Sequence, residues 1–215
     1  MNQEIIENLR RDYRSATLAE ADVNPNPIKQ FDKWFNEALQ AQIYEPNAMT
    51  LATATPDGRP SARIVLLKGF DDRGFKFYTN YLSRKGKELT KNPLATLVFF
   101  WAETERQVRI EGTIEKLSKD VSANYFHSRP KGSQIGAIVS PQSQEIKSRE
   151  DLEQKWQQLE QEYENKSVPK PAHWGGYILK PNLIEFWQGR SSRLHDRIIY
   201  KKIDQQSWKI VRLAP

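Results

Sequence analysis

The stretch Ala48-Met49-Thr50-Leu51-Ala52-Thr53-Ala54, followed directly by Thr55-Pro56-Asp57-Gly58, decides the fold class of this chain. The first seven residues are typical of a β-strand, and the turn leads into a second strand from about Ser61 to Phe70. Further strands are predicted over residues 75–79, 94–101, 106–117, 174–180, 184–188, 194–202 and 207–213. Strands joined in hairpins predict a mainly β or α+β fold, a small antiparallel barrel with peripheral helices.

Helices are predicted before and between these strands. Apolar residues at helical spacing indicate an amphipathic helix, with Ile28, Phe31, Trp34, Phe35, Ala38 and Leu39 on one stripe. Shorter helices are predicted over residues 83–91 and 118–128, and Pro130 stops the second of these and opens another that runs to about Val139. Ser148 with Asp151 resembles a capping box at the start of a last helix. Because strands and helices do not alternate regularly, a doubly wound parallel sheet is not expected.

The polar segment 1–26 predicts a mobile N-terminal arm, and residues 27–215 predict a single domain. Within the arm, Arg10-Arg11-Asp12-Tyr13 is rich in side chains that bind ligands. A solvated helix end would explain the same composition.

The 215-residue chain has a formal net charge of +6 and a pI near 9.4, which suits phosphate-bearing ligands and also nucleic acid. Its basic residues are dispersed, which weakens the nucleic-acid interpretation. The absence of cysteine excludes disulfides, thiolate metal sites and a cysteine nucleophile. The polar start and the short apolar run 94–102 predict neither a signal peptide nor a membrane span, so a cytoplasmic protein without membrane contact is expected.

A candidate binding face combines Glu185-Phe186-Trp187-Gln188-Gly189 with Arg193-Leu194-His195-Asp196-Arg197. On a regular strand Arg193, His195 and Arg197 point to one face, and a turn after Gly189 folds the indole ring back beside them. Cationic groups beside an aromatic plane suit a flat, electron-rich, anionic ligand. A solvated edge strand with alternating charge is the alternative.

Other clusters suit phosphate groups. Arg63-Ile64-Val65-Leu66-Leu67-Lys68 places cations at both ends of an apolar strand. Ser83-Arg84-Lys85 opens a predicted helix, where free N–H groups favour phosphate, although a basic helix end without a ligand is the alternative. Hydroxyl and guanidinium groups that suit a second phosphate recur every four residues around Pro130, at Tyr125, Arg129 and Ser133. Neutral hydrogen-bonding groups are added by Gln107, Gln142 and Ser143.

Taken in order, these segments resemble the pyridoxine (pyridoxamine) 5'-phosphate oxidase family. The resemblance runs from about Arg10 to Pro215 and includes Tyr78-Thr79-Asn80, Gln107-Val108-Arg109, Tyr125-Phe126, Ser133-Gln134-Ile135-Gly136-Ala137, Trp174-Gly175-Gly176 and Arg212-Leu213-Ala214-Pro215. It departs at Tyr78, where relatives often carry Phe, and in the variable loop Arg190-Ser191-Ser192. The family implies a homodimeric FMN-binding split barrel of antiparallel strands with peripheral helices, with FMN in clefts at the subunit interface.

The resemblance also implies the roles of individual residues. The implied cofactor-binding residues are Arg63, Ile64, Val65, Leu66, Leu67, Lys68, Tyr78, Thr79, Arg84, Lys85, Gln107, Gln142, Ser143, Trp187 and Arg197, some of them from the partner subunit. The implied substrate-binding residues are Arg10, Arg11, Asp12, Tyr13, Lys68, Tyr125, Arg129, Ser133, Arg193, Leu194 and His195, with residues 10–13 as a lid. Arg193 and His195 are the implied catalytic residues, and no metal is expected.

The implied reaction oxidises pyridoxine 5'-phosphate and pyridoxamine 5'-phosphate to pyridoxal 5'-phosphate. A hydride leaves the substrate C4' carbon for the flavin N5, and O2 reoxidises the flavin, releasing H2O2 and, from the amine, ammonia. Arg197 is expected to stabilise the reduced flavin. Because a guanidinium stays protonated, Arg193 is assigned to stacking and orientation, whereas proton transfer and hydrogen bonding are both open to His195.

Three other functions are compatible with parts of this pattern. Another FMN oxidoreductase of the same barrel type would keep the flavin residues without requiring the implied substrate residues together. A non-catalytic protein that stores pyridoxal 5'-phosphate or flavin would not consume oxygen. Nucleic-acid binding would be salt-dependent.

Overall fold

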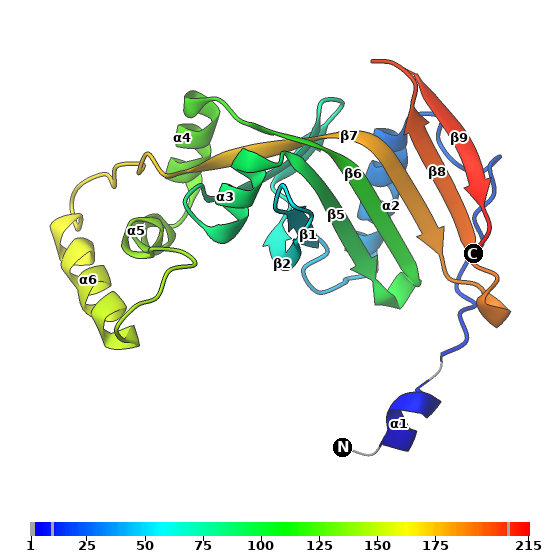
Figure 1. The fold of residues 1–215 in the computed structure, drawn as a ribbon, viewed down its shortest axis with the longest axis horizontal. Coiled ribbons are helices and arrows are strands. Elements are labelled where there is room, and N and C mark those ends of the chain that lie inside the picture. Colours follow the sequence, from blue (N-terminus) through cyan, green and yellow to red (C-terminus); the bar gives the residue numbers. More distant parts are fainter. Residues whose placement is uncertain (1–2, 10, 206) are drawn as a thin grey trace. The chain divides into compact units, whose positions relative to one another are not determined.

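The computed structural model describes residues 3–9, 11–205 and 207–215 of the chain (Figure 1). The strands are β1 (Ala48–Ala54), β2 (Pro60–Leu66), β3 (Gly69–Asp71), β4 (Gly74–Asn80), β5 (Leu94–Trp101), β6 (Arg106–Lys116), β7 (Trp174–Gln188), β8 (Asp196–Lys202) and β9 (Trp208–Leu213). The helices are α1 (Gln3–Asn8), α2 (Pro27–Gln40), α3 (Arg84–Lys91), α4 (Lys119–Ser128), α5 (Lys131–Val139) and α6 (Arg149–Glu162). Short 3₁₀ turns cover Ala102–Thr104 and Ser191–Arg193.

Over the residues that the structure describes, nine strands form one sheet in the order β2-β1-β5-β6-β7-β4-β3, and β8 and β9 join it through β7. The strands β4 and β8 both pair with β7 in the antiparallel sense, and β9 pairs with β8 in the same way. The predicted antiparallel barrel with peripheral helices is confirmed.

The strand β7 runs without a break from Trp174 to Gln188, so the prediction of two separate strands in this region was wrong. Pairing with β4 reaches Leu179, and pairing with β8 begins at Leu183. The strand therefore exchanges one partner for another around Pro181. A proline has no N–H to donate, and a strand tolerates it where one edge lacks a partner.

Two other predicted strands differ from those observed. The strand predicted from about Ser61 to Phe70 is split, because β2 ends at Leu66 and β3 begins at Gly69, whose φ of +152° suits glycine. The strand predicted over residues 194–202 begins only at Asp196. The segment before it forms a 3₁₀ turn instead.

The chain divides into two compact units. The first consists of the described residues up to Met49, together with Leu97–Glu111 and Pro181–Pro215. Its core includes two aromatic side chains of α2: Phe31 packs on Phe99, and the Trp34 ring meets Phe186 edge-on, each pair with 5.1 Å between ring centroids.

The helix α2 begins as its sequence predicts. The Asn26 side chain accepts hydrogen bonds from the N–H groups of Ile28 and Lys29, and Pro27 occupies the first helical position. The predicted apolar stripe is buried at residues 28, 31, 34 and 38 but not at Leu39, which is 51% exposed. The predictions of a mobile arm and a single domain remain predictions.

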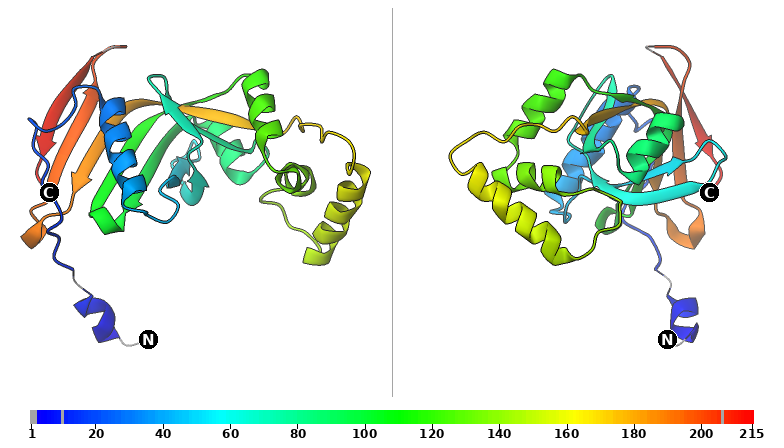
Figure 2. Two further views of the ribbon diagram at one scale, coloured as in Figure 1. Left: turned by 180° about the vertical axis from the view of Figure 1, so that it is seen from behind. Right: turned by 60° about the vertical axis from the view of Figure 1, so that its left-hand side comes forward.

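The second unit consists of Thr50–Thr96 and Gly112–Lys180. In it α4, α5 and α6 surround a small core, and Figure 2 shows α5 and α6 side by side. The buried members of this core are Phe126, Ile135, Val168 and Trp174. As predicted, Pro130 separates α4 from α5, and the Ser148 hydroxyl caps α6 by accepting from the N–H of Asp151. None of the described helices has the length and apolar character that crossing a membrane requires.

Candidate functional site

One pocket of the second unit gathers many of the predicted site residues. It has a volume of about 480 Å³ and is lined from β2, β4, α3, α4, α5 and β7. Of the predicted residues, its lining includes Ile64, Val65, Leu66, Lys68, Tyr78, Thr79, Lys85, Tyr125, Arg129, Ser133 and Gln142. Segments far apart in the sequence therefore meet around one cavity.

Arg129 supplies a buried cation to this pocket. It lies at the break between α4 and α5, where Pro130 favours the extended backbone observed (φ −78°, ψ 152°). Its guanidinium lies 4.7 Å from the centroid of the Trp174 ring, and its Nη1 is buried with no hydrogen-bond partner in the described part of the chain. Burial lowers the pKa of Arg129, but a guanidinium keeps its charge. A buried charged donor that lacks an acceptor is costly, so the position fits an anion.

Two tyrosines form an aromatic wall beside Arg129. The rings of Tyr78 and Tyr125 are stacked with 3.8 Å between centroids, and both are also stacked with Trp174. Burial raises the pKa of both tyrosines, so at neutral pH their hydroxyls are protonated and can donate hydrogen bonds. The wall suits a flat ring, and the hydroxyls suit an oxyanion.

A second cation, Lys85, enters the pocket from the first turn of α3. Its Nζ lies 3.2 Å from Thr79 Oγ1 and 3.1 Å from Gln142 Oε1. Burial, and to a lesser degree the charge of Arg63, lowers the pKa of Lys85. The start of α3 is fixed locally, because the Ser83 hydroxyl caps the helix by accepting from the N–H of Gly86.

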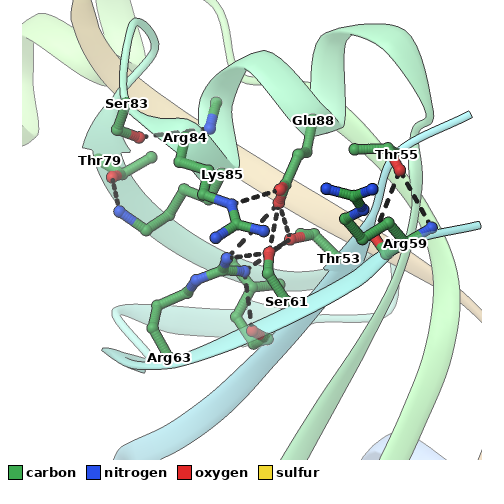
Figure 3. Close-up of polar contacts among 12 residues, drawn as sticks. Thr53, Thr55, Arg59, Ser61, Arg63, Thr79, Ser83, Arg84, Lys85 and Glu88 are labelled. Carbon is green, nitrogen blue, oxygen red and sulfur yellow. Dashed lines mark hydrogen bonds and ion pairs between the residues drawn. The ribbon is translucent and has the colours of Figure 1, made fainter. Parts of the chain in front are cut away.

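Two further predicted cations, Arg63 and Arg84, meet at a carboxylate, that of Glu88 (Figure 3). Burial opposes ionisation of this carboxyl, but hydrogen bonds from Ser61, Thr53 and Arg84 lower its pKa to about 2. Glu88 is therefore an anion at neutral pH. Sequence analysis missed it, although its spacing of four residues from Arg84 on a predicted helix was a usable signal.

In the first unit, the turn after Gly189 brings Trp187 and His195 together. The two rings lie 4.7 Å apart between centroids, as the sequence predicted. His195 Nδ1 accepts a hydrogen bond from the backbone N–H of Arg190, with 3.1 Å between the two nitrogens. In a neutral imidazole, the ring proton is then on Nε2.

The predicted alternation of Arg193, His195 and Arg197 along one strand was wrong. Of these three, only Arg197 lies in β8, while Arg193 belongs to the 3₁₀ turn. Ser192 and Arg193 have φ values of +55° and +60°, a left-handed conformation that costs energy for residues with a side chain.

A buried carboxylate also orders Arg197. The Glu185 side chain is 3% exposed and accepts hydrogen bonds from Arg197 and from Arg109. Burial opposes ionisation of Glu185, and the two guanidiniums lower its pKa. Arg197 also donates through Nη1 to the carbonyl of Ala214. The sequence indicated Arg197 but not the role of Glu185.

The N-terminal arm lies against the same unit. A pocket of about 560 Å³ is lined by Leu9, Arg11, Asp12, Tyr13, Arg190, Ser192, Arg193 and His195. The Tyr13 ring meets Trp187 edge-on at 5.8 Å between centroids. The buried Glu105 carboxylate holds the following residues by accepting from the backbone N–H groups of Arg14 and Ser15, at 2.8 and 2.9 Å. The structure thus brings the predicted lid residues 11–13 beside His195, while Arg10 lies outside the described residues.

The other predicted site residues lie outside these two pocket linings. Gln107 is half-buried on β6, Leu67 is buried between β2 and β3, and Ser143 lies in the loop after α5 with a φ of +68°. Leu194 is 70% exposed next to the 3₁₀ turn. Their binding roles remain predictions. Among the described residues, no group of three or more His, Asp and Glu side chains is arranged to hold a metal ion.

Comparison with known proteins supports the family resemblance over nearly the whole chain. Residues 35–163 match the family model described as pyridoxamine 5'-phosphate oxidase, and residues 174–215 match a pyridoxine 5'-phosphate oxidase C-terminal dimerisation region. A pyridoxine/pyridoxamine 5'-phosphate oxidase from a Nostoc species is 60% identical over 98% of both chains. Another, from Acaryochloris marina, is 60% identical over 99% of this chain and 97% of its own.

Solved structures agree with this fold. PhzG from Burkholderia lata, solved with tetrahydrophenazine-1-carboxylic acid, is 34% identical, covers 94% of this chain and all of its own, and superimposes with a TM-score of 0.87. A pyridoxamine 5'-phosphate oxidase-related, FMN-binding protein from Nostoc punctiforme is 18% identical with a TM-score of 0.69 and supports the fold alone.

The antiparallel sheet and its peripheral helices define a split barrel. The sequence matches are more specific than the fold, because they identify the family. The chain belongs to the pyridoxine/pyridoxamine 5'-phosphate oxidase family.

Proposed function

We propose that the protein oxidises pyridoxine 5'-phosphate and pyridoxamine 5'-phosphate to pyridoxal 5'-phosphate, using FMN and O2 and releasing H2O2 and, from the amine, ammonia. Relatives about 60% identical over nearly their full length support the reaction. The structural observation that carries the choice of substrate is the buried, unpartnered Nη1 of Arg129 in an aromatic pocket. That position fits a phosphate group better than an uncharged one.

The residues of the second unit fit the FMN phosphate. Lys85, Arg63 and Arg84 supply cations, and Thr79 and Gln142 supply polar atoms next to Lys85. Bound FMN would accept two electrons from the substrate carbon and pass them to O2. Residues 64–66 form part of the pocket wall. The family resemblance assigns Gln107, Ser143, Trp187 and Arg197 to the same cofactor, some of them from the partner subunit.

The protein's own side chains bind and orient the substrate. Lys68, Tyr125, Arg129 and Ser133, which share one pocket, hold its phosphate. Arg193 and His195 contact the pyridine ring, and His195 donates from Nε2 because its Nδ1 already accepts from the backbone. The described residues of the predicted lid, 11–13, are expected to close over the substrate and exclude water.

We expect the purified protein to be yellow and to carry about one FMN per subunit, because Arg63, Arg84 and Lys85 supply cations for the cofactor phosphate. Chromatography of the released flavin identifies it, and an oxygen electrode then measures turnover with each phosphorylated substrate. FAD in place of FMN would contradict the cofactor assignment. Bound FMN without oxygen consumption would instead favour a storage protein, and turnover with other substrates only would favour a different oxidoreductase of this fold.

We further propose a cytoplasmic homodimer with FMN at the subunit interface and no role in nucleic-acid or membrane binding. The match of residues 174–215 to a dimerisation region supports the dimer. The strand β2 lies at one end of the sheet order, and its residue Ile64, which lines the pocket, is 65% exposed. A second copy that covers this strand would bury that surface and bring its own residues to the cofactor.

Dilution is therefore expected to release FMN as the dimer dissociates, since one chain does not supply the whole site. Light scattering across a dilution series, with flavin fluorescence followed in parallel, measures both events. A monomer that keeps full FMN affinity would exclude the shared site.

A further inference from the structure

Glu88 is a buried carboxylate within the cluster of cations at the start of α3. Its side chain is 5% exposed, whereas those of Arg63 and Arg84 are 20% and 59% exposed. We propose that Glu88 is a positioning residue of the cofactor site, which orients Arg63 and Arg84 toward the phosphate of FMN. This inference rests on the proposed FMN function.

The contacts of Glu88 join three elements of the second unit (Figure 3). Its Oε2 accepts from the hydroxyls of Thr53 on β1 and Ser61 on β2, at 2.5 and 2.6 Å, and lies 3.5 Å from Arg63 Nη2. Its Oε1 accepts from Arg84 Nε at 2.9 Å. Both carboxylate oxygens are therefore engaged, and each faces a different arginine.

The two arginines keep donors that these contacts do not use. Within the described part of the chain, Arg84 bonds Glu88 through Nε, and neither Nη group has a hydrogen bond. Arg63 uses Nη1 for Leu51 O and Thr53 Oγ1, and Nη2 for Ser61 Oγ. A guanidinium has five N–H donors in a rigid plane, so fixing one edge of Arg84 sets the direction of the other.

The charges of the cluster also match a phosphate monoester. Arg63, Arg84 and Lys85 with Glu88 carry a net charge of +2. A phosphate monoester carries a charge of about −1.5 to −2 at neutral pH. Without Glu88, the half-buried Arg63 would lose its ionic partner, and the largely exposed Arg84 would regain side-chain freedom.

Removal of the Glu88 charge has two effects of opposite sign on FMN. It frees the arginines, which weakens phosphate binding, and it removes a negative charge near the phosphate, which strengthens binding. Positioning is expected to dominate. Thr53 and Ser61 donate to the carboxylate and partly neutralise it, whereas an arginine side chain released from Glu88 must lose its rotamer freedom again when it binds the phosphate.

Glu88→Gln, which keeps the size of the side chain, is the direct test, with FMN and riboflavin as probes. Quenching of flavin fluorescence measures the dissociation constants of both ligands for the apoprotein. We expect FMN binding to weaken on the order of tenfold, as for the loss of a charged hydrogen bond, and riboflavin binding, which involves no phosphate, to change little. Asp71→Asn is the matched control, because Asp71 also pairs with an arginine and a lysine but belongs to neither pocket lining.

Glu88→Asp keeps the charge and withdraws the carboxylate from the arginines, so it covers the case in which the glutamine variant fails to fold. It should also weaken FMN selectively. Equal weakening of FMN and riboflavin would show a purely structural role, and tighter FMN binding would show that repulsion dominates. Either outcome overturns the positioning role. If the parent protein itself does not bind FMN, the proposed function fails instead.

Discussion

Replacement of Arg129 by alanine is expected to raise the KM for pyridoxine 5'-phosphate on the order of ten- to a hundredfold, because a charged hydrogen bond contributes roughly 1.5–3 kcal/mol. The guanidinium is already ordered over Trp174, and its buried Nη1 has no acceptor among the described residues. In the proposed site, the substrate phosphate would supply that acceptor. The loss should therefore fall on substrate binding, as steady-state kinetics at controlled oxygen concentration would measure.

Two controls separate this effect from general damage to the protein. Pyridoxine without its phosphate should react equally poorly with the variant and the parent. Arg149→Ala removes an exposed arginine that pairs with Glu153 on α6, and should leave the KM unchanged. An unchanged KM in Arg129→Ala, or a parallel loss of FMN, would exclude Arg129 from the substrate-phosphate site.

The parts of the fold that the sequence predicts are those with local causes. The break between α4 and α5 follows from the steric effect of Pro130 on the residue before it, and Arg129 is accordingly extended. The caps at Ser83 and Ser148 likewise depend on atoms within three residues. These local signals positioned Lys85 and Arg129 correctly on their elements.

The errors and omissions have causes distant in the sequence. The sequence predicted two strands where the structure has the single strand β7. This strand changes its pairing partner around Pro181, and the change can be seen only in the sheet. Glu88 was missed because its hydroxyl partners lie 27 and 35 residues away. The grouping of the pocket residues came from the family resemblance, since no periodicity links β2 to α5.

The start of β8 shows how distant contacts override strand periodicity. Asp196 begins the strand and accepts from the backbone N–H of Leu18 in the arm, while Arg190 and Arg212 pair with its carboxylate. Burial opposes ionisation of Asp196, and these contacts lower its pKa. The carboxylate thus fixes both ends of the turn that carries Arg193. The pairing of β8 with β7 begins at Asp196, so the residues before it do not follow the alternation of a strand. The turn sets the positions of Arg193 and His195 instead.

The strained turn suggests that Arg193 is held in place for the reaction. Its φ of +60° follows a φ of +55° at Ser192, and two consecutive left-handed residues with side chains persist only when their surroundings impose them. Such preorganisation is useful for a side chain that must align a substrate ring. The planar guanidinium can stack on a pyridine, whereas the ammonium of lysine cannot.

Arg193→Lys is therefore expected to lower kcat for oxidation of pyridoxine 5'-phosphate by on the order of a hundredfold, the cost of a misplaced substrate, although the charge is kept. FMN should stay bound, because Arg193 lines the pocket beside His195 and not the pocket that contains Lys85. Rapid reduction of the bound flavin under anaerobic conditions measures this step without the reaction with oxygen. If the charge also contributes, flavin reduction should be slower still in Arg193→Ala than in Arg193→Lys. Flavin reduction in Arg193→Lys at the parent rate would show that charge alone is sufficient and that the planar group does not orient the ring.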